Sequence, residues 1–202
     1  YSAAVDQAFD DVRRGPPMPP TRVRGSLLQA VAELPGQVNS VAVNENYLLT
    51  GLPAPTLHTV LHNGLNERFS GANAGTMFGE GSYFAEDAGK CDQYTRAADT
   101  AYKQQPALHS LHDLLYESRD EHPGDVCYVL VCRVVLGYTL RTQHPCRHGR
   151  DGRGTAMDAG ATDDGTVFAT RRHKELKAVP GCEPALHYHS LLAELGGSIH
   201  RY

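Results

Sequence analysis

Apolar side chains recur at helical spacing along several stretches of the chain. Val5, Phe9 and Val12 share one face of a helix predicted over residues 2–14, which Gly15 can end. The proline-rich run at residues 16–20 is a stiff connector, because proline fixes φ and has no amide proton to donate. Further helices are predicted over residues 26–34, 88–103, 109–118 and 184–195.

A strand, a glycine turn and a helix follow one another around residue 50. Residues 47–49 form an apolar run that is too short for a helix, and the run stops at Thr50 and Gly51. A helical pattern then begins at Pro53, and Gly64 lies just past its end, as is typical of helix termini.

The second half of the chain is predicted to contain a clear strand and a long loop. β-Branched valines crowd residues 126–140, and Gly137 can end this strand. Residues 147–165 are rich in glycine and poor in apolar side chains, so they are predicted to form a long mobile loop. The arginines of this loop are interpreted as solvated side chains rather than as nucleic-acid contacts. A further strand is predicted to begin at Ser198.

Composition narrows the class of protein. The 202 residues are expected to form a single domain over 1–202, trimmed at one or both ends, because the first residue is not Met. A formal charge of −4 gives no electrostatic argument for nucleic acid. Neither an apolar run of about eighteen residues nor a leader is present, so no membrane contact is predicted. The five cysteines, without framework spacing, predict reduced thiols in an intracellular protein, cytoplasmic or nuclear. The domain is expected to be monomeric.

A glycine-rich segment with aromatic residues occupies positions 71–85. Glycine lets the backbone turn sharply and approach a ligand closely, because it has no Cβ. The spacing of these glycines matches neither the Walker loop nor the dinucleotide fingerprint, so both of those phosphate-binding motifs are excluded. From the residues alone, a structural turn and a binding site both stay open.

The sequence of this segment resembles a known family. Residues 77–86, MFGEGSYFAE, followed by Lys90, Gln93 and Tyr94, are similar to the NAD-binding centre of the poly(ADP-ribose) polymerase family. Residues 64–68 resemble the tankyrase and mono-ADP-ribosyltransferase branches in particular, and weaker similarity recurs at 127–139 and 165–169. The resemblance implies an α+β ADP-ribosyltransferase fold, with two packed antiparallel sheets, flanking helices and an NAD crevice.

The same resemblance implies a set of site residues. In the family, a glycine at the position of Gly51 grips the nicotinamide amide through its backbone, and tyrosines matching Tyr83 and Tyr94 hold the two faces of the ring. Cys91 stands where the family has a serine that hydrogen-bonds this amide. NAD-binding roles are thereby implied for Gly51, Arg68, Phe84, Ala85, Cys91 and Tyr94, and catalytic roles for Thr50 and Tyr83.

Two departures from the family pattern affect the expected activity. Thr50 occupies the position of a histidine that orders the donor, and its shorter side chain cannot reach as far. The family's catalytic glutamate lies at the start of a late strand, which places it just beyond Tyr202. Glu175, Glu183 and Glu194 lack that strand context, so no catalytic acid is assigned.

Three functions follow from these observations. The first is transfer of one ADP-ribose from NAD to a protein or nucleic-acid acceptor, with release of nicotinamide. The alternatives are a catalytically silent module that binds NAD or ADP-ribose, and hydrolysis of NAD by water. NAD is expected as the substrate and no metal is expected, because the cysteines and histidines lack the close pairing of a zinc site. Cys91 is not expected to act as a nucleophile, because no partner histidine stands at a recognisable position.

Overall fold

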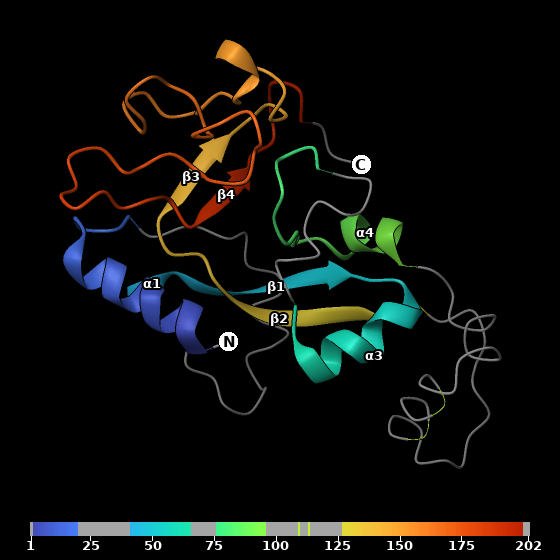
Figure 1. The fold of residues 1–202 in the computed structure, drawn as a ribbon. Helices are drawn as coiled ribbons and strands as arrows, with labels where there is room; N and C mark the ends of the chain where they lie inside the picture. Colours follow the sequence, from blue (N-terminus) through green and yellow to red (C-terminus); the bar gives the residue numbers. More distant parts are fainter. Residues whose placement is uncertain are drawn as a thin grey trace.

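The computed structural model describes residues 2–19, 41–65, 76–95, 109, 113 and 127–199, and Figure 1 shows their arrangement. The helix predicted over 26–34, most of the helix predicted over 109–118, and Arg68 lie outside the described residues. None of the helices in the described ranges has the length and apolar composition needed to cross a bilayer.

The site is organised around an antiparallel pair of strands, β1 (Glu45–Gly51) and β2 (Val129–Val135). Gly51 lies opposite Val129 in this ladder, and Glu45 lies opposite Val135. The β1 side chains from Tyr47 to Thr50 are all buried, which explains why the strand appears in the sequence as a continuous apolar run. The second edge of β1 is also occupied, because Leu49 and Ala85 exchange two backbone hydrogen bonds of 2.8 Å each.

Two helices form where the sequence predicts them. α1 (Ser2–Arg14) ends at Gly15, and α3 (Ala54–Asn63) begins after Pro53 and ends at Gly64, which has a φ of 74°. A hydrogen bond of 2.5 Å from the Tyr138 hydroxyl to the Pro16 carbonyl ties the end of α1 to the start of the second strand pair. Local periodicity and terminus residues were therefore sufficient to predict these two elements.

The second strand pair differs from the predicted architecture. β3 (Thr139–Thr142) and β4 (Ser190–Ala193) run parallel, whereas two antiparallel sheets are expected from the resemblance. The strand predicted over 126–140 is interrupted, because Gly137, with a φ of 56°, redirects the chain between β2 and β3. Leu140 of β3 forms a buried hydrophobic cluster with Cys146, Val167 and Phe168.

The helix predicted over 184–195 is wrong. Residues 190–193 form β4, whose backbone pairs with β3, and long-range pairing overrides the helical spacing of the apolar residues. Residues 196–199 form a turn closed by a bridge between Gly196 and Ile199, so the predicted strand does not begin at Ser198, and residues 200–202 lie outside the described residues. The short strand expected from the resemblance at 165–169 is reduced to one bridge, between Phe168 and Leu176.

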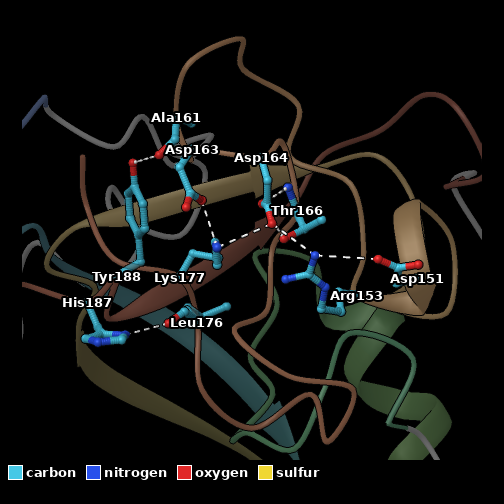
Figure 2. A network of polar contacts seen from close by, with 10 residues as sticks. All are labelled: Asp151, Arg153, Ala161, Asp163, Asp164, Thr166, Leu176, Lys177, His187 and Tyr188. Atoms are coloured by element: carbon cyan, nitrogen blue, oxygen red, sulfur yellow. Dashed lines mark hydrogen bonds and ion pairs between the residues drawn. The ribbon is translucent and has the colours of Figure 1, made fainter.

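Residues 147–165 contain no strand or α-helix, only the 3-10 turn η4 (Arg150–Gly152), and specific polar contacts hold them (Figure 2). The Thr166 hydroxyl donates to one carboxylate oxygen of Asp164 at 2.6 Å, and Arg153 donates to the other at 3.0 Å. Lys177 bridges this carboxylate at 3.4 Å and that of Asp163 at 2.7 Å. The bond from Thr166, opposed in part by burial, holds the pKa of Asp164 well below its usual range, so this carboxylate is charged at neutral pH.

Candidate functional site

The last residue of β1 is in close contact with a short helix, α4 (Ala88–Cys91). A Cβ built on Gly51 would overlap the backbone carbonyl of Cys91 and would lie 3.1 Å from Cγ2 of Thr95. Only glycine permits this approach of two backbones. The structure therefore brings together Gly51 and Cys91, which the sequence places 40 positions apart.

Cys91 is a buried, neutral thiol. Its side chain is 3% exposed, and burial raises its pKa, although a backbone hydrogen bond with Gly51 opposes this shift. A thiol with a raised pKa carries little thiolate at neutral pH, so it is a poor nucleophile. That Cys91 does not act as a nucleophile stays a prediction from the sequence.

Thr50 and Ala85 lie beside this contact. Thr50 is buried in β1 opposite Leu130, and Ala85 is attached to β1 through its two hydrogen bonds to Leu49. Phe84, next to Ala85, is half-buried. These contacts fix the aromatic end of the glycine-rich segment next to the end of β1. In Figure 1 this segment is drawn above β1.

Hydrogen bonds at the hydroxyl hold the ring of Tyr83, whose side chain is 40% exposed. The Phe78 amide donates to the Tyr83 hydroxyl at 2.9 Å, and this hydroxyl donates to the Gly79 carbonyl at 2.8 Å. Burial is the main cause that raises the pKa of Tyr83, and Cys146 and Tyr94 add to the shift. The phenol is therefore neutral at physiological pH, and its hydroxyl remains a donor.

Tyr94 provides a second accessible aromatic ring, at the end of the 3-10 turn η3 (Asp92–Tyr94). Its side chain is 47% exposed, and Lys90 Nζ lies 5.7 Å from the ring centroid. The continuous helix predicted over 88–103 is wrong at Thr95, whose φ of −91° and ψ of 160° are extended. The chain leaves the helix there, next to Gly51, because Thr95 is buried in that contact.

Sequence reasoning missed the residues that support the glycine-rich segment. The Cys146 amide donates to the Met77 carbonyl at 2.7 Å, and the Glu80 amide donates to the His173 carbonyl at 2.8 Å. Cys146 lies before and His173 lies after the loop predicted over residues 147–165, and no motif connects either of them to residues 76–80. The only indication in the sequence was the glycine at position 79. The structure shows why a glycine stands there, because Gly79 is buried in close packing and has a φ of 101°.

The remaining candidate groups do not form a site in the described part of the chain. No three histidine, cysteine, aspartate or glutamate side chains in that part converge to hold a metal ion. Glu175 and Glu194 pair at 3.7 Å with His187 and Arg141, respectively, so neither is assigned as the catalytic acid. A hollow of about 240 Å³ is lined by Asp163 and residues 177–182, and none of the predicted site residues lines it.

The geometry first defines a class: a mixed α/β domain with a candidate ligand site where a buried strand, a short helix and two accessible tyrosines meet. Among curated proteins, no relative matches the chain. A protein-family model described as the poly(ADP-ribose) polymerase catalytic domain matches residues 32–186. Because this match covers more than half of the chain, the protein belongs to the poly(ADP-ribose) polymerase family. Membership confirms the predicted family and supports the ADP-ribosyltransferase fold and ADP-ribosyltransferase activity with NAD as the substrate.

Proposed function

We propose that this protein transfers a single ADP-ribose from NAD to a protein or nucleic-acid acceptor and releases nicotinamide. The observation that carries the proposal is the close contact of Gly51 with α4, beside the accessible rings of Tyr83 and Tyr94. A backbone amide next to two aromatic faces suits a flat ring that carries a carboxamide, which is the chemistry of nicotinamide. The similarity of residues 64–68 to the mono-ADP-ribosyltransferase branch further supports single transfer.

In this proposal each site residue has a distinct role in binding NAD. Gly51 hydrogen-bonds the carboxamide through its backbone, and Tyr83 and Tyr94 stack on the two faces of the nicotinamide ring. The Cys91 thiol is the side-chain donor to the carboxamide, and it is a weaker donor than a serine hydroxyl. Phe84 and Ala85 hold the aromatic segment against β1, and Arg68 is assigned to the adenosine end on the resemblance alone.

The reaction breaks the C–N bond between ribose and nicotinamide, and the electron pair leaves with nicotinamide. An acceptor nucleophile then attacks C1′ of the ribose and loses its proton. Fixing the carboxamide and the ring orients this bond for cleavage, which contributes to catalysis by lowering the entropic cost of reaching the transition state. Thr50 supplies a short hydroxyl for the donor ribose in place of the family's histidine.

The test is release of nicotinamide from NAD by the purified protein, with and without a protein acceptor. We expect more nicotinamide release than in the buffer control, and transfer of labelled ADP-ribose from NAD to the acceptor. Release without label on any acceptor would indicate NAD hydrolysis.

Thr50 favours a second candidate, a silent module that binds NAD or ADP-ribose without turnover, because a threonine replaces a donor-ordering histidine. Binding of NAD measured by calorimetry, without any release of nicotinamide, would establish this candidate and overturn the first. An intracellular location and a monomeric state stay predictions from the sequence.

A further inference from the structure

Residues 76–80 are tied at three backbone positions to two residues that lie far away in the sequence. Cys146 provides two of these contacts, from its amide to the Met77 carbonyl at 2.7 Å and from its thiol to the Thr76 carbonyl at 3.4 Å. His173 provides the third, because its carbonyl accepts from the Glu80 amide at 2.8 Å. The segment is therefore anchored on both sides of Phe78 and Gly79.

Cys146 and His173 also contact each other. The Cys146 Sγ lies 3.5 Å from His173 Nδ1, and His173 Nε2 lies 2.6 Å from the Gly152 carbonyl. A carbonyl can only accept, so Nε2 carries the proton, and Nδ1 of the neutral ring is an acceptor. The buried thiol of Cys146, whose pKa is raised by burial, therefore shares its proton between the Thr76 carbonyl and His173. These contacts link the two anchors into one unit.

Close packing leaves Gly79 little room to move between these anchors. A Cβ on Gly79 would lie 2.5 Å from the His173 carbonyl oxygen and 2.6 Å from Cζ of Phe168. The Phe168 ring in turn packs edge-on against His173, with 5.1 Å between the ring centroids. A shift of His173 would therefore displace Gly79 directly.

We propose that Cys146 and His173 are positioning residues for Tyr83. The two groups that hold the Tyr83 hydroxyl are the Phe78 amide and the Gly79 carbonyl, which lie between the anchored positions. Because Tyr83 is 40% exposed, packing covers only part of the residue, and these hydrogen bonds set the orientation of its ring. The consequence for nicotinamide rests on the proposed function, since neither Cys146 nor His173 is placed against the reacting atoms.

The test uses two variants of the full chain, each with a matched control. Cys146→Ala removes the thiol contacts and leaves the backbone contact to Met77. His173→Asn removes the ring but retains a residue that tolerates the φ of 52° at this position. Cys182→Ala and His187→Asn are the controls, because His187 also bonds a backbone carbonyl, that of Leu176, at 2.7 Å.

The first measurement is the affinity for benzamide, an uncharged nicotinamide analogue, by calorimetry in a double-mutant cycle with Tyr83→Phe. Each test variant should weaken binding about fivefold, the effect of losing one net hydrogen bond. In the Tyr83→Phe background, each test variant should weaken benzamide binding further by less than about twofold, because both changes act through the same hydroxyl. Additive losses, or equal losses in the controls, would overturn the proposal.

The second measurement is amide hydrogen exchange at residues 76–85, which requires no ligand. The Phe78 and Glu80 amides should exchange faster in Cys146→Ala than in Cys182→Ala, and unchanged exchange would overturn the proposal. If Cys146→Ala fails to fold, Cys146→Ser and His173→Asn provide the same comparison. If the unmodified chain binds no benzamide and releases no nicotinamide, the proposed function fails, while hydrogen exchange still decides the positioning role.

Discussion

Replacing Gly51 by alanine adds one methyl group at the most crowded contact of the candidate site. The new Cβ would overlap the Cys91 carbonyl, and relief requires either the end of β1 or the end of α4 to move. Overpacking of this kind costs about 1–3 kcal/mol. For a chain of 202 residues, each kcal/mol lost from the free energy of unfolding lowers Tm by about 2–4 °C. The Tm of Gly51→Ala should therefore be lower by about 2–12 °C.

The effect on ligand binding should be larger than the loss of stability suggests. The same movement displaces Cys91 and the backbone amide proposed to grip the carboxamide, so benzamide affinity should fall by about tenfold or more. Calorimetry at a temperature well below both melting transitions measures this loss on folded protein. Gly81→Ala is the matched control, because a Cβ there meets nothing within 4 Å. It should keep both Tm and affinity close to those of the unmodified chain.

Unchanged melting and unchanged affinity in Gly51→Ala would refute the packing argument at the end of β1. A large fall in Tm with unchanged benzamide affinity would retain the contact but refute its assignment as the carboxamide site. Equal losses in Gly81→Ala would show that any added methyl group in these glycine-containing segments is harmful.

Three further predictions concern two site residues and the polar contacts of Asp164. Tyr94→Ala should weaken benzamide binding about tenfold or more, equivalent to about 1.4 kcal/mol, and unchanged affinity would remove Tyr94 from the site. Thr50→His should raise nicotinamide release if the rest of the site is competent, whereas Thr50→Ala should lower NAD affinity several-fold if the hydroxyl binds the ribose. Asp164→Asn should lower Tm more than Asp163→Asn at pH 7, because only Asp164 also bonds Thr166 and Arg153. Since the folded pKa of Asp164 is depressed, this difference should hold above about pH 5 and shrink as the pH falls below about 4; a difference independent of pH would refute it.

The sequence by itself determined the elements whose signals are local. α1 and α3 follow from apolar residues at helical spacing and from the proline and glycine at their ends. β1 follows from its buried apolar run. The family also follows from the sequence, because its motif is a continuous stretch of residues. These features depend on neighbours within a few positions, so a linear pattern records them.

The tertiary structure decided the features that depend on distant partners. β4 is a strand because it pairs with β3, and the Thr139 and Ser190 hydroxyls, 51 positions apart, lie 2.9 Å from each other. The helix after Cys91 ends at Thr95 because that residue is buried against Gly51. Cys146 and His173 contact residues 76–80 in part through backbone groups, and such contacts place almost no requirement on the residue type and so leave no motif. Which backbone groups form hydrogen bonds, and which segment buries another, is decided only when the chain is folded.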